Sequence, residues 1–186
     1  MIFIKTYEKF NIGSPLLDLE NNVDFDLINI IKSTVPSGSD ILEISCGNGS
    51  DSAYLSSIGY KVICSETNDD YVENARSIGL ECLNHDTRNT FPFKDGQFDL
   101  IYSRLGLHYF TVDELDKILK ELSRIGDKLL ITVKLVNDIQ TNKVILTEKV
   151  WKESIGEYFT ISKYKVQDGV LYGSHSKWLE ILASSK

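Results

Sequence analysis

The stretch DILEISCGNGSDSAYLSSIGYKVICSETN, residues 40–68, decides the fold of this chain. A short apolar run, Ile41–Ile44, leads into a turn over residues 45–49 that contains two glycines. A helix is predicted over residues 50–57, and a second apolar run, Tyr60–Cys64, follows it. A strand, a tight turn, a helix and another strand in this order predict a βαβ unit with parallel strands.

The turn in this unit is suited to a cofactor that contains a nucleoside. Gly47 and Gly49 let the backbone approach a ligand closely, because glycine carries no Cβ atom. The helix that begins after them directs unpaired N–H groups toward the same space. Glu66 ends the second predicted strand, where a carboxylate can accept hydrogen bonds from both hydroxyls of a ribose. The stretch therefore indicates a nucleoside-cofactor site.

Two families share this layout, and they differ in the spacing of their glycines. The dinucleotide-binding fingerprint is G-x-G-x-x-G, and its third glycine would fall on Ser52. The class I S-adenosylmethionine-dependent methyltransferases carry an acidic residue followed by x-Gly-x-Gly-x-Gly, and a second acidic residue at the end of the next strand. Residues 43–49 and Glu66 resemble this pattern, with Ser45 where most members carry glycine. The resemblance implies S-adenosyl-L-methionine as the cofactor and S-adenosyl-L-homocysteine as the product.

The resemblance extends over most of the chain. Segments 49–62, 102–109 and 177–183 are similar to the small-molecule branch of the family, which includes tellurite-resistance-like and methyltransferase type 11-like proteins. It implies an α/β fold with a doubly wound, Rossmann-like sheet, mostly parallel with an antiparallel C-terminal strand. It also implies a single methyltransferase domain over residues 1–186, with an N-terminal arm and helix over 1–36 and the core over 37–186.

Several residues match positions that contact the cofactor in this family. An acidic residue after the third strand binds the adenine amino group in relatives, and Asp86 matches that position; alternatively, Asp86 caps a loop. Tyr7 is a candidate for an N-terminal lid over the cofactor, or for an aromatic anchor of the arm. The full set of predicted cofactor-binding residues is Glu43, Ser45, Cys46, Gly47, Gly49, Glu66, Thr67, Asp86, Thr87 and Ser103.

Substrate chemistry is expected after the fourth predicted strand, residues 97–103. Ligands of doubly wound sheets bind beyond the carboxyl ends of the strands. His108 is the candidate general base, because an ordinary imidazole pKa of about 6.5 suits proton transfer near neutral pH. A hydrogen bond to the backbone is the alternative role. Tyr109 and Arg104 are further candidates, and Arg104 would neutralise an anionic substrate group or form a surface ion pair.

Motif and charge both narrow the substrate class. Family members that methylate base nitrogens or glutamine amides carry Asp/Asn-Pro-Pro-aromatic after the fourth strand, whereas this chain has Ser103–Gly106. The net charge is -7 and no dense basic run occurs, which disfavours nucleic acid as a partner. No apolar run approaches the ~20 residues of a membrane span. We therefore predict methyl transfer to an oxygen or nitrogen of a small metabolite by a monomer or homodimer. The alternative is a non-catalytic cofactor-binding or scaffold protein of the same fold.

The chain contains three cysteines: Cys46, Cys64 and Cys82. An odd number without paired spacing predicts neither a disulfide framework nor a zinc motif. Buried free thiols in a reducing cytoplasm are therefore expected, and no metal is predicted. The N-terminal segment becomes charged too early for a signal peptide, which also favours a cytoplasmic protein.

The remaining pattern predicts the connecting elements. A helix is expected after Asp24, and another after Asn68 with Tyr71, Val72 and Ala75 facing inward. A third begins at Thr111, where Glu114 completes a capping box. Three expectations complete the chain: a polar loop over 137–143, a helix over 147–156 and a hairpin turn at 167–169 between two final strands.

Overall fold

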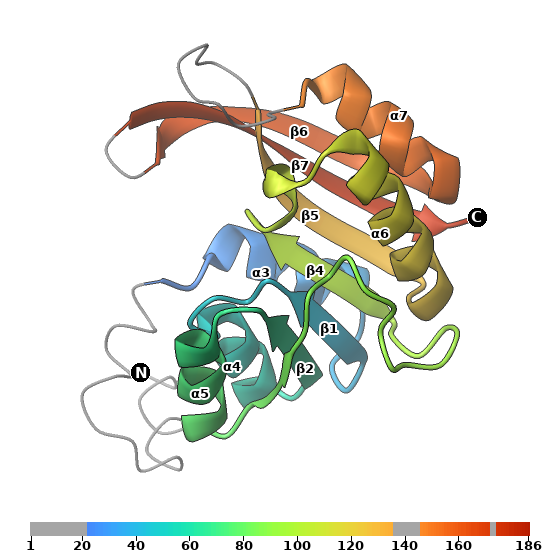
Figure 1. The fold of residues 1–186 in the computed structure, drawn as a ribbon. Helices are drawn as coiled ribbons and strands as arrows, with labels where there is room; N and C mark the ends of the chain where they lie inside the picture. Colours follow the sequence, from blue (N-terminus) through green and yellow to red (C-terminus); the bar gives the residue numbers. More distant parts are fainter. Residues whose placement is uncertain (1–21, 136–145, 172–173) are drawn as a thin grey trace. The chain divides into compact units, whose positions relative to one another are not determined.

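The computed structural model describes residues 22–135, 146–171 and 174–186. The chain divides into two compact units, residues 1–86 and residues 87–186 (Figure 1). Tyr7 and the predicted loop over 137–143 lie outside the described residues. The single domain over 1–186, with its arm and helix over 1–36, stays a prediction.

Three parallel strands form the sheet of the first unit in the order β3-β2-β1. They are β1 (Asp40–Ile44), β2 (Lys61–Glu66) and β3 (Glu81–Asn84). The register places Glu43 beside Cys64, and Cys64 beside Cys82. Side chains paired in this way point to the same face of a parallel sheet, since the side-chain period of a strand is two. The predicted βαβ unit is confirmed.

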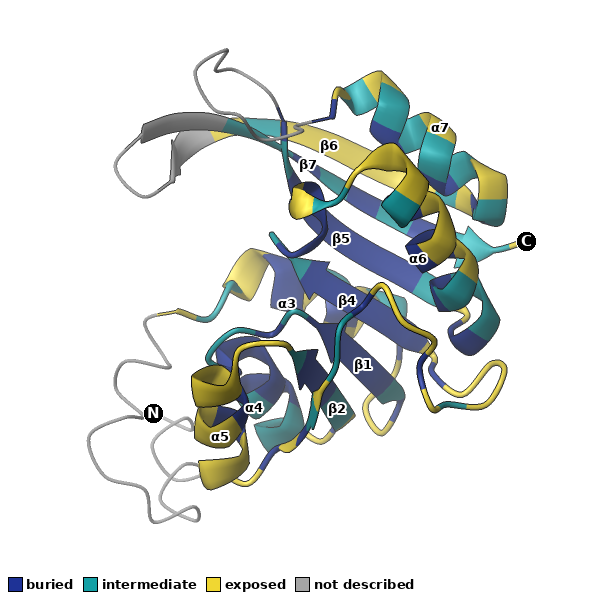
Figure 2. Ribbon diagram, in the orientation of Figure 1, coloured by how far each residue is buried: buried dark blue, intermediate teal, exposed yellow. Residues whose placement is uncertain are grey.

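The described part of the first unit, residues 22–86, contains three helices: α3 (Phe25–Thr34), α4 (Ser50–Ser57) and α5 (Asp69–Ser77). Asn68 begins α5 as predicted, because its side chain accepts hydrogen bonds from the N–H groups of Asp70 and Tyr71. Val72 and Ala75 are buried, but Tyr71 is 48% exposed, so the prediction that Tyr71 faces inward is wrong. The apolar stripe of α5 is narrow, and Figure 2 shows the rest of its surface exposed.

Four strands form the sheet of the second unit in the order β4-β5-β7-β6. They are β4 (Leu100–Arg104), β5 (Lys128–Leu135), β6 (Phe159–Leu171) and β7 (Ser174–Ser185). Strands β4 and β5 are parallel, whereas β7 is antiparallel to both β5 and β6. Figure 2 shows β4 and β5 buried along most of their length. The predicted α/β class, mostly parallel with an antiparallel C-terminal strand, is confirmed.

The helical elements of the second unit are η2 (Leu107–Tyr109), α6 (Val112–Ile125) and α7 (Glu148–Tyr158). The capping box at the start of α6 is present: Thr111 accepts from the N–H of Glu114, and Glu114 accepts from the N–H of Thr111. One face of α6 is buried through Leu115, Ile118, Leu119, Leu122 and Ile125. No helix in the described ranges is both long and apolar enough to cross a membrane.

The hairpin signal at residues 167–169 is wrong. These residues continue β6, and Asp168 pairs with Lys177 of β7 across the ladder, with Nζ of Lys177 3.6 Å from Oδ1 of Asp168. An Asp-Gly pair favours a two-residue turn locally. Here the pairing of the two strands continues beyond that dipeptide, so tertiary hydrogen bonding overrides the local preference.

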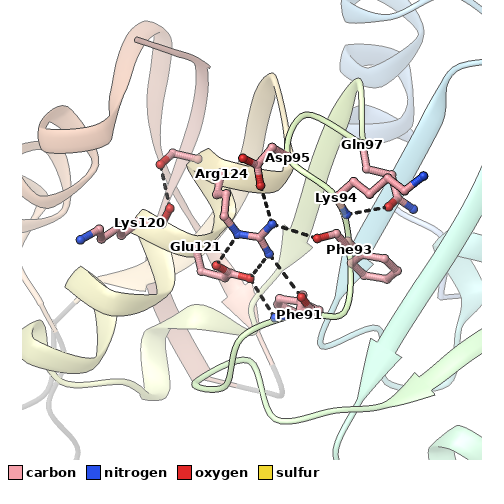
Figure 3. Close-up of polar contacts among 9 residues, drawn as sticks. Phe91, Phe93, Lys94, Asp95, Gln97, Lys120, Glu121 and Arg124 are labelled. Carbon is pink, nitrogen blue, oxygen red and sulfur yellow. Dashed lines mark hydrogen bonds and ion pairs between the residues drawn. The ribbon is translucent and has the colours of Figure 1, made fainter.

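The segment that precedes β4 is fastened to α6 by one arginine (Figure 3). The guanidinium of Arg124 donates two hydrogen bonds to Glu121, at 2.9 and 2.6 Å, and one to Asp95 at 2.8 Å. It also donates to the carbonyl oxygens of Phe93 at 2.9 Å and Phe91 at 3.2 Å. The N–H of Phe91 in turn donates to Glu121 at 2.8 Å. This network fixes the chain entering β4.

Candidate cofactor-binding site

The two glycines of the turn after β1 have different structural roles. Both have positive φ, 55° at Gly47 and 76° at Gly49, which glycine adopts without strain. A Cβ atom at Gly47 would meet nothing within 4 Å, so the backbone is open to a ligand there. A Cβ atom at Gly49 would lie 2.8 Å from Cδ1 of Leu80 and 3.4 Å from Cβ of Ala75. Gly49 therefore lets the turn pack closely against β3 and α5.

The carboxylate of Glu66 joins the end of β2 to this turn. Its Oε2 atom accepts a hydrogen bond from the N–H of Gly47 at 3.0 Å. Its Oε1 atom accepts from the N–H groups of Thr67 at 2.7 Å and Asn68 at 3.2 Å. Because a carboxylate oxygen has two lone pairs, Oε2 retains capacity for a ligand hydroxyl beside Gly47. The carboxylate is thus held in one orientation at the open part of the turn.

Glu43 lies beneath the turn, in the interior of the first unit. Its side chain is 3% exposed and accepts a hydrogen bond from the hydroxyl of Ser52 in α4. Ser52 occupies the position where the dinucleotide fingerprint requires glycine, and here its hydroxyl ties the helix to β1. Sequence reasoning used Ser52 only to exclude a dinucleotide. The sequence does contain a signal for this contact: Ser52 follows the acidic residue Glu43 by nine positions, across the turn.

Ser45 adopts a backbone conformation that serine rarely takes. Its φ is 56°, in the left-handed region that favours glycine. In the second unit, Leu105 directly follows β4 and has a similar positive φ of 58°. The N–H of Leu105 donates to the carbonyl of Thr132 at 2.7 Å, which holds this conformation. Strained residues of this kind cluster at functional sites, and sequence reasoning missed Leu105.

The remaining predicted residues of the first unit follow β3. The N–H of His85 donates to the carbonyl oxygen of Glu66 at 2.9 Å, so the chain after β3 runs along the end of β2. Asp86 follows His85 directly and is half-buried at the end of this unit. Thr87, the first residue of the second unit, is buried.

In the second unit, the predicted cofactor residue Ser103 and the predicted catalytic residue Arg104 end β4, and the two other predicted catalytic residues lie in η2. Ser103 is fully buried, Arg104 is half-buried, and η2 carries His108 and Tyr109. His108 is 9% exposed, whereas Tyr109 is 61% exposed; their ring centroids lie 4.2 Å apart. The structure therefore shelters the imidazole and leaves the phenol at the surface.

In the described structure, three strands each carry one buried hydroxyl without a partner. They are Oγ of Ser65 in β2, Oγ of Ser103 in β4 and Oγ1 of Thr132 in β5, and none has a hydrogen-bond partner among the described residues. Buried polar groups almost always bind protein, water or ligand. In the first unit, the open backbone at Gly47, the oriented Glu66 carboxylate and the buried Ser65 hydroxyl fit a polar cofactor such as S-adenosylmethionine.

The three cysteines converge in the first unit. Their Sγ atoms all lie within 4.8 Å of one another, and those of Cys46 and Cys82 are 4.0 Å apart. Hydrogen bonds from Cys46 and Cys64, and then the charge of Arg76, lower the pKa of the Cys82 thiol. The pKa of Cys46 is raised, first by its hydrogen bonds with Cys64 and Cys82 and then by burial. The predicted buried free thiols are confirmed; their convergence was not predicted.

Replacing Ser45 by glycine is expected to raise the free energy of unfolding by about 0.5–1 kcal/mol. The left-handed conformation costs an L-residue about 1–2 kcal/mol, and the greater freedom of glycine in the unfolded chain offsets part of that gain. Ser56→Gly, inside α4, is the matched control and should lower stability by about 0.5–1 kcal/mol. Urea denaturation measures both. A less stable Ser45→Gly protein would contradict the assignment of strain to Ser45.

Comparison with known proteins agrees with this geometry. Residues 41–127 match the model of a family described as a methyltransferase domain. The match begins in β1 and ends at the residue before β5, so it includes the turn, Glu66, Asp86 and η2. A search of curated proteins gave no match.

Solved structures with this fold include several methyltransferases. A SAM-dependent methyltransferase from Methanosarcina mazei is 20% identical over 84% of this chain and 96% of its own, with a TM-score of 0.72. TehB from Haemophilus influenzae is 18% identical over 88% and 63%, with a TM-score of 0.72. Magnesium protoporphyrin IX methyltransferase from Synechocystis, solved with bound SAM, is 15% identical over 91% and 79%, with a TM-score of 0.67. These likenesses establish the fold.

Proposed function

We propose that this chain is a class I S-adenosylmethionine-dependent methyltransferase that transfers a methyl group to an oxygen or nitrogen of a small metabolite. The match of residues 41–127 to a methyltransferase-domain model supports the activity and the cofactor. The main support for a cofactor site is the position of Glu66. Its carboxylate accepts a hydrogen bond from the N–H of Gly47, 3.0 Å away, beside backbone that is open to a ligand. A carboxylate in this arrangement can receive the ribose hydroxyls without reorganisation.

The residues of the chain would bind the cofactor, orient the acceptor and remove a proton from it. When bound, S-adenosylmethionine supplies a methyl group on a positively charged sulfur. Glu66 would accept the ribose hydroxyls, the turn at Gly47 would receive the rest of the nucleoside, and Asp86 would accept from the adenine amino group. Holding an acceptor atom in line with the methyl group can supply about 7–11 kcal/mol of the barrier reduction. His108 would take the proton when the acceptor is a hydroxyl or an ammonium.

Charge and sequence support a small acceptor in the cytoplasm. The net charge of -7 opposes binding to a polyanion, and the segment Ser103–Gly106 lacks the Pro-Pro-aromatic motif of base and amide methylation. The three free cysteines are buried in the first unit, which suits a reducing compartment. Arg104 would then pair with an anionic group of the metabolite, and Tyr109 would contact it at the surface.

Parallel titrations test the cofactor and then the acceptor. Isothermal titration with S-adenosylmethionine, S-adenosylhomocysteine and NAD should give micromolar binding of the first two compounds and no binding of NAD. Incubation of the protein with methyl-labelled cofactor and separate pools of metabolites, nucleic acid and protein should then label the metabolite fraction. Label in nucleic acid or protein would overturn the acceptor class. Failure to bind either sulfur nucleoside would favour the scaffold alternative.

Replacing Glu66 by alanine is expected to weaken S-adenosylmethionine binding about 10- to 150-fold. Loss of hydrogen bonds to a charged group costs about 1.5–3 kcal/mol, and each 1.4 kcal/mol is about tenfold in affinity. Glu73→Ala, on the exposed side of α5, is the matched control and should bind normally. Titration calorimetry measures the affinities, and thermal unfolding checks that the turn stays folded without its anchor. An unchanged affinity would remove Glu66 from the site.

A further inference from the structure

Three thiols from three separate segments of the first unit point to one place. Cys46 belongs to the turn after β1, Cys64 to β2 and Cys82 to β3. The parallel register puts Cys64 and Cys82 side by side on one face, and the turn brings Cys46 over them. Their exposed fractions are 8%, 1% and 5%, so the sulfurs face inward. Cysteines that only fill a core have no need to converge in this way.

The separation of the sulfurs suits a single metal ion. A metal–sulfur distance of about 2.3 Å places two sulfurs of a planar three-coordinate site about 4.0 Å apart. The Sγ atoms of Cys46 and Cys82 are 4.0 Å apart, and no pair in the group exceeds 4.8 Å. The other two pairs, at most 4.8 Å apart, would have to close by less than about 1 Å to complete the triangle. The backbone is therefore already arranged for three sulfur ligands.

The surroundings select the kind of ion. Val72, Ala75, Ile78 and Leu80 line the cluster, so the pocket is apolar. Within the described residues, the group contains three ligand atoms and no fourth histidine, cysteine or acid. Structural zinc sites take four protein ligands, whereas softer ions accept sulfur alone. The nearest charges are of opposite sign: Arg76, whose Nε donates to the carbonyl of Cys82 at 2.9 Å, and Glu43, in register with Cys64.

We propose that Cys46, Cys64 and Cys82 form a binding site for one soft, thiophilic cation held by three thiolates. Binding replaces three sulfur–hydrogen bonds by three sulfur–metal bonds and releases the thiol protons and the water ligands of the ion, with no change of oxidation state. The site lies beneath the turn that carries Gly47, and it shares Cys46 with the predicted cofactor-binding residues. Metal binding by the three thiols nevertheless needs neither cofactor nor acceptor.

Cadmium is the probe that tests this site in the reduced full-length protein. Titration with Cd²⁺ should give one ion per chain, with ultraviolet sulfur-to-cadmium absorbance and a cadmium-113 chemical shift typical of three sulfur ligands. Because binding releases protons to the buffer, the observed enthalpy of the titration should vary linearly with the ionisation enthalpy of the buffer. Absence of the charge-transfer band, or a shift typical of one sulfur, would overturn the proposal, and neither reading depends on a variant that folds.

Two variants separate metal binding from the integrity of the core. Cys64→Ala should abolish the three-sulfur signal, because two thiols remain. Val72→Ala removes side-chain volume from the same apolar cluster but keeps every sulfur, so its cadmium spectrum should match the unmodified protein. Equal three-sulfur signals from Cys64→Ala and the unmodified protein would show that the ion binds elsewhere and would reject the site.

Discussion

Replacement of His108 by alanine is expected to lower the rate of methyl transfer by about 100- to 10,000-fold, the usual contribution of a positioned general base. The affinity for S-adenosylmethionine should stay nearly unchanged, because the proposed contacts with the cofactor are made by other residues, above all Glu66 and the turn at Gly47. The effect is expected to be large because the imidazole is 9% exposed, so bulk water is a poor substitute for it. Single-turnover transfer from methyl-labelled cofactor to the identified acceptor measures the rate directly.

Matched variants distinguish a base from a structural histidine. His108→Gln preserves the volume and a hydrogen-bonding group but cannot accept the proton, so it should be nearly as slow as His108→Ala. Tyr109→Phe alters the neighbouring ring, whose centroid is 4.2 Å from that of His108, and should retain most activity. Added imidazole should partly restore His108→Ala. Full activity of His108→Gln would end the assignment of His108 as the base.

Replacement of Arg124 by alanine is expected to lower the free energy of unfolding by about 2–4 kcal/mol. Charge-assisted hydrogen bonds contribute about 1.5–3 kcal/mol, and Arg124 makes three of them to Glu121 and Asp95. Its side chain is 30% exposed and that of Glu121 15%, so the loss should fall short of that of a fully buried pair. The substitution also leaves the Phe91 and Phe93 carbonyls without this donor. Urea denaturation measures the change.

The stabilisation by the Arg124–Glu121 pair is expected to depend on pH. The pKa of Glu121 is lowered, first by its hydrogen bonds with Arg124, so its carboxylate stabilises the folded state above the ordinary glutamate pKa of about 4.3. That contribution is lost as the pH falls through the lowered pKa. The stability difference between the unmodified protein and Arg124→Ala should therefore be largest near pH 7 and shrink below about pH 4. A difference that is constant over this range would exclude the ion pair as its source.

Two control variants isolate the geometry of the arginine. Arg124→Lys keeps the charge but loses the planar fork that binds Glu121 through two atoms, so it should recover only part of the stability. Lys149→Ala breaks an exposed pair with Glu153, 3.7 Å away, and should have little effect because exposed pairs contribute little. Full recovery by lysine would show that charge alone matters at this position.

Sequence alone determined the elements that depend on neighbouring residues. The turn at 45–49 and its flanking strand and helix follow from apolar runs and glycines within a few positions of each other. The cap at Asn68 and the capping box at Thr111 and Glu114 are equally local, because their donors and acceptors lie two or three residues apart. These patterns were sufficient to predict the α/β class, and the resemblance of the same residues to class I methyltransferases predicted S-adenosylmethionine as the cofactor.

Only the tertiary structure decided features that depend on strand pairing and packing. The Asp168–Gly169 pair favours a turn locally, but the ladder between β6 and β7 keeps it extended. The strained Leu105 is held by a carbonyl from β5, and the open backbone at Gly47 is distinguished from the packed backbone at Gly49 only by their surroundings. The three cysteines are far apart in the chain and meet because β2 and β3 pair in one register. A one-residue change in that register would turn Cys82 to the opposite face, since side chains alternate along a strand.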